Sequence, residues 1–296
     1  MFSATIVFEN DEEGYMKSYK EGICFSIPML TGIVIFYVLG LGITVYYAFT
    51  GRESVLNGFS EVFSNEAFRL ALSNTVRFQL IVIPLTLAMS FIIEVSIYDL
   101  NKNIINILFL LPLAVPSNAV SVIWRIIFSE FGMLNKVVNA MTGQTIDFFS
   151  GDGAFWLTVM TFVWKNLGIA LLIWKLGMDI IPKSIYEAAE LDGATEGKQL
   201  LYMTIPNLKT VFIIEFIVLS INSFKGYRES FLIFGNYPDE KIYMLQNVFN
   251  NWLSRLELSK LASGAIIYMG IILMVAGIIF GLSAIFRVTR KLRCRV

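Results

Sequence analysis

Long apolar segments separated by short polar connections dominate the chain. About 20 mostly apolar residues suffice to cross a bilayer as a helix. Six segments meet this length, at residues 23–49, 72–97, 104–128, 154–178, 208–233 and 261–286. Lipid satisfies no backbone hydrogen bonds, and the segments lack the alternation of barrel strands. The pattern therefore predicts an all-α membrane protein with six transmembrane helices.

The basic residues predict the orientation of these helices. With six spans both termini lie on one side, and the connections on that side carry eleven Lys and Arg against six on the other. The eleven are Lys17, Lys20, Lys102, Lys183, Lys198, Lys209, Arg287, Arg290, Lys291, Arg293 and Arg295, and the six are Arg52, Arg69, Lys136, Lys241, Arg255 and Lys260. By the positive-inside rule, both termini are predicted to be cytoplasmic. Residues 1–22 then form a cytoplasmic N-terminal segment, 23–286 the six-helix transmembrane domain and 287–296 a basic cytoplasmic tail.

The composition supports the membrane prediction and argues against several other classes. Hydrophobic residues make up 56% of the chain and charged residues 16%, below the 25% or so of soluble domains. The net charge of zero argues against a nucleic-acid partner. Histidine is absent and there are two cysteines, so we find neither a catalytic set nor a metal site and expect no cofactor on this chain.

A polar stretch, "SIYEAAELDGATEGKQLLYMTIP", interrupts the apolar second half of the chain. Ser184 and Glu187 fit a capping box at the start of a short helix, and Gly193 fits its left-handed C-cap. A second helix is expected from about Thr195 to Met203, ended by Pro206. The stretch is predicted to be a cytoplasmic helical hairpin, within a loop at 179–207. An ordinary surface loop would show the same local signals.

Its pattern resembles the EAA loop of ABC importer permeases, whose form is Glu-Ala-Ala, three residues, Gly, nine residues, then Ile-x-Leu-Pro. Met203 and Ile205 stand in place of the Ile and Leu, and Thr210 replaces a frequent proline. Asp192 and Ala194 fit the Asp-Gly-Ala form of carbohydrate permeases. The positions that match the family form are Glu187, Ala188, Ala189, Gly193 and Pro206. The two alanines would leave a low-relief surface that a partner can approach closely.

The resemblance extends over most of the chain. Three apolar stretches look like the second, third and fourth spans of the maltose and multiple-sugar permeases: "NTVRFQLIVIPLTLAMSFIIEV", "LPLAVPSNAVSVIWRIIFSEFGMLN" and "WKNLGIALLIWKLGMDIIPKSIYEAAELDGA". "YPDEKIYMLQNVFNNW" is similar to the loop after their fifth span. The resemblance implies the type I ABC importer permease fold and import of a carbohydrate across a bacterial or archaeal plasma membrane.

The resemblance also implies partners. The hairpin would be a coupling helix that docks on a cytoplasmic ATPase, with Glu187 meeting a basic residue there. The chain has no Walker A sequence, so ATP and Mg would bind two copies of a separate ATPase. A second homologous permease, forming a heterodimer, and an extracellular solute-binding protein would complete the complex.

The segment "INSFKGYRES" at 221–230 indicates the substrate pathway. Charges in a span are unfavourable against lipid and favour a water-filled cavity. In the resembling sugar permeases this region lines the substrate site, and Phe224 and Tyr227 match its aromatic positions. The candidate pathway residues are Asn222, Phe224, Lys225, Tyr227 and Arg228, with Trp164, Lys165 and Asn166 from the fourth span. The alternatives are helix packing for the fourth-span residues and a structural salt bridge, either between Arg228 and Glu229 or between subunits.

Two further questions stay open at this level. An ion-coupled carrier would need buried carboxylates, for which Glu94 and Glu215 are candidates, although Glu94 lies near a span end that water can reach. The substrate's charge is also undecided between a neutral oligosaccharide and an anionic sugar. Six basic residues lie in or beside the spans against three acids, which would make the pathway electropositive: Arg77, Arg125, Lys165, Lys175, Lys225 and Arg228, against Glu94, Glu215 and Glu229.

Overall fold

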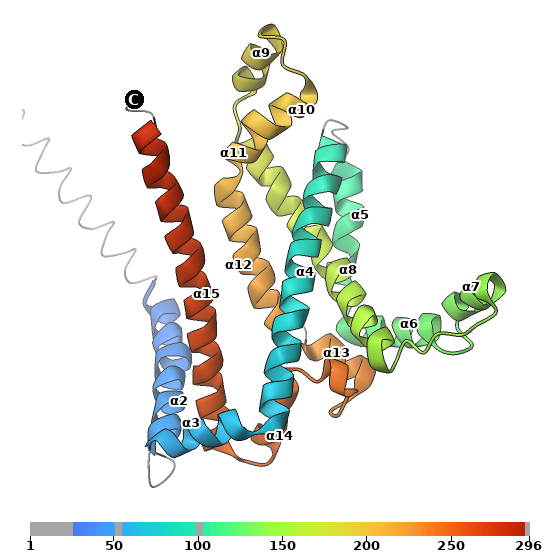
Figure 1. Ribbon diagram of the computed structural model, residues 1–296, viewed down its shortest axis with the longest axis vertical. Coiled ribbons are helices and arrows are strands. Elements are labelled where there is room, and N and C mark those ends of the chain that lie inside the picture. The colour runs from blue at the N-terminus through green and yellow to red at the C-terminus, as the bar shows by residue number, and fades with distance from the viewer. Residues whose placement is uncertain (1–25, 51–54, 99–102, 226, 294–296) are drawn as a thin grey trace, which may run out of the picture. The chain divides into compact units, whose positions relative to one another are not determined.

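The computed structural model describes residues 26–50, 55–98, 103–225 and 227–293. Within these ranges some side chains, most of them beyond Met274, are not described. Every regular element in these ranges is a helix (Figure 1). The chain divides into two compact units, residues 1–64 with 252–296 and residues 65–251. The predicted N-terminal segment 1–22 and the end of the tail, 294–296, lie outside the described residues.

The first unit joins helices from both ends of the chain. An apolar helix spans Ser26–Thr50 and contains a π-helical turn, η1 (Val34–Val38), followed by α2 (Leu39–Thr50). α3 (Val55–Ser64) and α2 both pack against α15 (Leu258–Arg293). Lys260 at the start of α15 pairs with Glu61 at 3.3 Å. Apolar side chains of the first helix, such as Phe36 and Val38, are exposed within this unit, as expected of a helix that faces lipid or another subunit.

The second unit is built around α8 (Gly151–Asp179), which packs against α4 (Glu66–Tyr98), α5 (Asn103–Ala114) and α12 (Lys209–Lys225). The core includes Phe78, Val82, Phe162, Trp174 and Leu219. The fourth predicted span carries charge and is weaker by hydropathy than the first and last, yet α8, which covers it, is the most enclosed of the described helices that are long enough to cross a membrane. Its polar residues therefore face neighbouring helices rather than lipid, which explains why they are tolerated.

The third predicted span, 104–128, is not one straight helix. α5 ends at Ala114, α6 (Ser117–Phe128) begins after Pro116, and the chain bends by 106° between them. Pro112 lies inside α5, whereas Pro116 occupies the N-cap of α6. Proline disfavours helical backbone at the residue before it, here Val115, and removes an N–H. Residues 104–128 were predicted as one span in which Pro112 and Pro116 would kink the helix; the structure has two helices with a break at residues 115 and 116 instead.

Three short helices, α6, α7 (Met133–Thr142) and α13 (Tyr227–Phe234), lie near one another in the second unit. α6 continues into α7, and α13 packs on α6 (Figure 1). Arg125 on α6 donates to the carbonyl oxygens of Leu232 and Ile233, at 3.2 and 2.8 Å. These bonds satisfy carbonyls at the end of α13 and complement its dipole. Arg125 therefore has a structural role.

The loop after α13 is tied to the start of α8. η3 (Glu240–Ile242) precedes α14 (Leu245–Ser254), and Asp239 accepts hydrogen bonds from the backbone N–H groups of Lys241 and Gly151. These bonds lower the pKa of Asp239 below its usual value, because they stabilise the charged carboxylate.

Four described helices are long and apolar enough to cross a membrane, or five if α5 and α6 form one bent span. They are Ser26–Thr50, α4, α8 and the segment Lys209–Phe234. α15 covers the sixth predicted span. The count of six and the cytoplasmic termini stay predictions.

Single cysteines in a background free of Cys24 and Cys294 test the predicted topology. The exposed positions Thr145 and Tyr237 should react with an impermeant maleimide added outside intact cells, whereas exposed Glu190 should react only after permeabilisation. The reason is the excess of basic residues on the hairpin side. Labelling of position 190 in intact cells would contradict the orientation.

Candidate functional site

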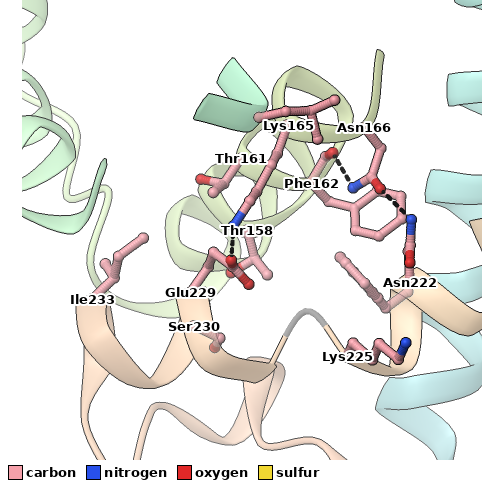
Figure 2. Close-up of a pocket in the computed structure, with 12 residues that line it drawn as sticks. Thr158, Thr161, Phe162, Lys165, Asn166, Asn222, Lys225, Glu229, Ser230 and Ile233 are labelled. Atoms are coloured by element: carbon pink, nitrogen blue, oxygen red, sulfur yellow. Dashed lines mark hydrogen bonds and ion pairs between the residues drawn. The ribbon is translucent and has the colours of Figure 1, made fainter. Parts of the chain in front are cut away.

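A cavity of about 230 Å³ lies within the second unit, between α8, α12 and α13 (Figure 2). α8 supplies residues 158, 161, 162, 165 and 166, whose spacing of three and four places them on one helix face. The full lining is Phe78, Leu113, Thr158, Thr161, Phe162, Lys165, Asn166, Asn222, Lys225, Glu229, Ser230 and Ile233. Polar and charged groups therefore converge on an otherwise apolar interior.

An ion pair forms one wall of this cavity. Lys165 on α8 pairs with Glu229 on α13, and both contact the hydroxyl of Ser117 at the start of α6. Ser117 lies 2.9 Å from the Lys165 ammonium and 2.8 Å from the Glu229 carboxylate. The side chains of Lys165 and Glu229 are 23% and 14% exposed. Removing one partner would leave a partly buried charge uncompensated.

An amide pair forms the opposite wall. Asn222 donates to the side-chain oxygen of Asn166 at 2.9 Å, and Asn166 donates to the carbonyl of Phe162 at 2.9 Å (Figure 2). The Ser230 hydroxyl is buried and has no hydrogen-bond partner in the described chain. Lys225 is exposed and forms no ion pair with any described residue. Buried polar groups are normally satisfied, so the cavity is suited to a ligand rich in hydroxyl groups.

The structure brings some predicted pathway residues together and separates others. Lys165, Asn166, Asn222 and Lys225 line the cavity. Trp164 instead packs edge-on against Trp124, with ring centroids 5.3 Å apart. Phe224 faces Phe249 and lines a smaller pocket, and Arg228 is exposed outside the lining. The side chain of Tyr227 lies outside the described part of the chain.

Several lining residues were missed by the sequence reasoning. Thr158, Thr161, Ser230 and the neighbouring Ser117 were not singled out, and Glu229 was considered as one of the three acids of the spans and as an alternative partner of Arg228. The structure pairs Glu229 with Lys165 instead. The recurrence of Thr, Lys and Asn every three to four residues in the fourth span was a usable signal. The position of Ser117 was not predictable, because it depends on the bend at Pro116.

The count of six bases against three acids overstates the positive charge of the pathway. Arg125 binds carbonyl oxygens of α13, Arg77 stacks over the ring of Phe155 at 4.5 Å, and Lys165 is neutralised by Glu229. Among the lining residues this leaves Lys225 as the cation without a described partner.

Glu94 and Glu215 lie away from the cavity lining and are both buried. Glu94 is 1% exposed, so the expectation that it reaches water was wrong: α4 continues to Tyr98 and packs along α8. Glu215 lies 3.0 Å from the hydroxyl of Ser90, which accepts from the indole N–H of Trp174. This arrangement joins α4, α8 and α12.

The polar hairpin consists of α9 (Lys183–Leu191) and a second arm formed by α10 (Glu196–Gln199), η2 (Leu200–Thr204) and α11 (Ile205–Asn207). Gly193 has φ +75°, the left-handed conformation predicted for it. The N–H of Gly193 bonds to the carbonyl of Glu190 and that of Ala194 to the carbonyl of Ala189, both at 2.9 Å. These are the two bonds of a Schellman motif. Tyr186 and Thr204 then join the arms through their hydroxyls at 2.9 Å.

Three local predictions for the hairpin were wrong. Pro182, not Ser184, is the N-cap of α9, and no side-chain cap forms, because Ser184 already lies inside the helix. Pro206 does not end the second arm but lies in α11, directly after the π-helical η2. Wider turns of this kind accommodate a proline ring within a helix. Ala189 is buried, so only Ala188 of the two alanines is exposed.

The exposed surface of the hairpin combines charge with apolar groups. Glu187 and Asp192 are exposed, and neither forms an ion pair with a described residue. Leu191 is 90% exposed, Tyr202 71% and Leu201 60%. Large apolar side chains at this exposure on a polar element indicate a binding surface for another protein. Figure 1 shows the hairpin and α13 at opposite ends of α12.

Comparisons with known proteins place this arrangement in context. Residues 81–293 match the family described as "Binding-protein-dependent transport system inner membrane component". The chain is 24% identical over 278 residues to the "Arabinooligosaccharides transport system permease protein AraP" of Bacillus subtilis, covering 89% of this chain and 88% of that protein. It is 24% identical over 234 residues to the "Trehalose/maltose transport system permease protein MalF" of Thermococcus litoralis, covering 75% and 79%.

A solved structure has the same fold. It is a bacterial ABC transporter involved in the import of the acidic polysaccharide alginate, and it matches 89% of this chain and 95% of its own with a TM-score of 0.75. The sequence identity is 16%.

Proposed function

The chain belongs to the family of binding-protein-dependent transport system inner membrane components, and from that premise we propose that it is the carbohydrate-translocating permease subunit of an ATP-driven importer. As a family member it is a multi-pass membrane subunit of a bacterial transport system and not an enzyme. The family's name also makes a solute-binding protein its partner.

The chemistry of the cavity supports a sugar as the substrate. Sugars present many hydroxyls and apolar C–H faces. The cavity offers the Asn166–Asn222 amide pair, the unpartnered Ser230 hydroxyl and the Lys165–Glu229 pair. Phe78 and Phe162 supply aromatic surface beside them, with centroids 5.7 Å apart. The convergence of polar groups, among them the unpartnered Ser230 hydroxyl, and aromatic rings on one cavity is the observation that carries the proposal. Relatives named for arabinooligosaccharides and for trehalose and maltose agree with it.

We favour a neutral oligosaccharide over an anionic sugar. The cavity contains one ion pair and one further cation, Lys225, whose exposure leaves it largely screened by water. The case for an anionic substrate rests on Lys225 and on the fold shared with the alginate importer. The cavity is smaller than the usual 300–1,000 Å³ or so of ligand sites, in keeping with a pathway completed by a second, homologous permease.

The hairpin is proposed to be the ATPase-docking element. Its exposed Glu187, Ala188, Asp192 and Leu191 form one face around the rigid turn at Gly193, and Pro206 lies in the arm that leads back to α12. Two copies of a cytoplasmic ATPase would bind ATP and Mg. Closure of the ATPase pair would move the hairpins together and shift the permeases between inward-facing and outward-facing states.

Replacement of Asn222 by leucine tests the cavity. The change removes a donor from the amide pair while keeping the side-chain volume similar, so affinity for the transported sugar should fall about tenfold. With the complete importer reconstituted in proteoliposomes, the affinity is measured from the dependence of uptake and of ATPase activity on sugar concentration. The exposed Ile214 on the same helix, changed to leucine, is the control. Unchanged uptake in Asn222→Leu would contradict the site.

A further inference from the structure

We propose that Glu229 is a specificity-determining residue: its carboxylate masks the ammonium of Lys165, so that the cavity accepts uncharged sugars and rejects anionic ones. The inference rests on the proposed function, because it concerns the substrate of the same cavity. It assigns Lys165 as a latent anion-binding group and Glu229 as its internal counter-ion.

The hydrogen-bonding capacity of the pair supports this assignment. The ammonium of Lys165 has three protons, of which two go to Glu229 and Ser117. One oxygen of Glu229 accepts hydrogen bonds from both the Lys165 ammonium and the Ser117 hydroxyl. The second carboxylate oxygen has no hydrogen-bond partner among the described residues. A sugar hydroxyl can donate to that oxygen and accept from the remaining ammonium proton, whereas a sugar carboxylate would meet the negative charge of Glu229.

The degree of burial makes Glu229 the deciding charge. The charged lining residues are Lys165, Lys225 and Glu229. Lys165 and Glu229 are largely enclosed, at 23% and 14% exposure, so their interactions are screened less than those of exposed Lys225. Without Glu229, the enclosed part of the cavity would hold an uncompensated positive charge. With it, that part carries no net charge.

The position of α13 does not depend on this ion pair alone. Arg125 binds the carbonyl oxygens of Leu232 and Ile233 at its other end. Ile233 is also buried in an apolar cluster with Val120, Trp124, Phe128 and Leu157. A Glu229→Gln variant keeps the side-chain shape and an oxygen acceptor for Lys165 and Ser117. We therefore expect it to fold with α13 in place and to change mainly the charge.

The experiment compares matched neutral and acidic sugars in the complete importer. Affinities are measured for cellobiose against cellobiouronic acid and for maltose against maltobiouronic acid, each pair differing by one carboxylate. The wild type should prefer the neutral member. Glu229→Gln should raise the ratio of acidic to neutral affinity at least about tenfold, since a nearby unpaired charge contributes on that scale. Glu229→Asp, which keeps the charge, should leave the ratio near the wild-type value.

A double variant identifies the source of any gain. Lys165→Met with Glu229→Gln removes both charges, so the gain in acidic affinity should disappear. Equal loss of both sugar classes in Glu229→Gln, a gain that persists in the double variant, or a wild type that prefers acidic sugars would each overturn the inference. If the wild type binds the neutral sugars and Glu229→Gln leaves the ratio of acidic to neutral affinity unchanged, the charge masking is refuted but the proposed function is not. A wild type that binds none of the four sugars refutes the proposed use of the cavity for such sugars, and the masking with it.

Discussion

Replacing Gly168 with alanine is expected to disrupt the packing of α5 on α8 and to lower the thermal stability of the protein sharply. A Cβ atom at this position would lie 2.0 Å from the carbonyl oxygen of Phe109 and 2.7 Å from its carbonyl carbon. Both atoms belong to the backbone of α5, which cannot move aside as a flexible side chain does. Overpacking of this kind costs about 1–3 kcal/mol and more where backbone must shift.

Differential scanning fluorimetry in detergent measures the effect. A loss of about 3 kcal/mol corresponds to a decrease in Tm of roughly 5 °C for a chain of 296 residues, because the entropy of unfolding is about 2.1 cal/mol/K per residue. The matched control is Gly42→Ala in α2, where a Cβ would have no heavy atom within 4 Å. There alanine should leave Tm unchanged or raise it slightly, because it favours helix over glycine. Equal Tm values for the two variants would contradict the close approach of α5 and α8.

The sequence predicts the long helices well because their signal is local. An apolar stretch of span length carries its own information, and α4, α8 and the helix Ser26–Thr50 follow the predicted spans. Pro112 and Pro116 indicated a kink in the third span, but not the full break that separates α5 from α6. Pro112 stays inside a helix and Pro116 starts a new one. Local sequence does not distinguish these outcomes, because they depend on packing against α8 and α13.

In the candidate site, too, some residues were predictable from local sequence and others depend on packing between helices. Charges in residues 221–230 indicated a polar cavity, and Lys225 and Asn222 do line one. Arg228 was one alternative partner for Glu229, because it is the adjacent base in sequence, but Glu229 pairs with Lys165. Residues next to each other in a helix point in different directions, so Arg228 is exposed while Glu229 reaches Lys165 on α8. In the hairpin, the αL glycine was predictable from its residue type, whereas the burial of Ala189 depends on tertiary packing that the local sequence does not show.

Glu187→Ala is expected to abolish most ATP-driven uptake while the protein still inserts and folds. Glu187 is exposed and makes no ion pair with a described residue, so its removal leaves the contacts of the hairpin intact. If its carboxylate meets a basic group of the ATPase, its loss leaves that group unpaired in the interface, at about 2–5 kcal/mol. Binding of the ATPase would then weaken by at least about thirtyfold.

Gly193→Val tests the turn of the same hairpin by a separate route. A Cβ here would have no heavy atom within 4 Å, so the effect comes from the backbone: φ is +75°, where a β-branched residue is strained by roughly 1–3 kcal/mol. The strain should change the angle between the two arms and reduce uptake. Gly197→Ala, an exposed helical position with free space, is the matched control and should transport normally.

Co-purification separates a docking defect from other causes of lost uptake. The Glu187→Ala permease should remain monodisperse, with an unchanged Tm, but should retain less ATPase after affinity purification. Glu190→Ala removes an exposed carboxylate one turn away on α9 and serves as the control. Glu190 is not one of the residues of the proposed docking face, so its replacement should leave ATPase retention near the wild-type value. Near-normal uptake and ATPase retention in both Glu187→Ala and Gly193→Val would show that the hairpin does not couple this chain to an ATPase.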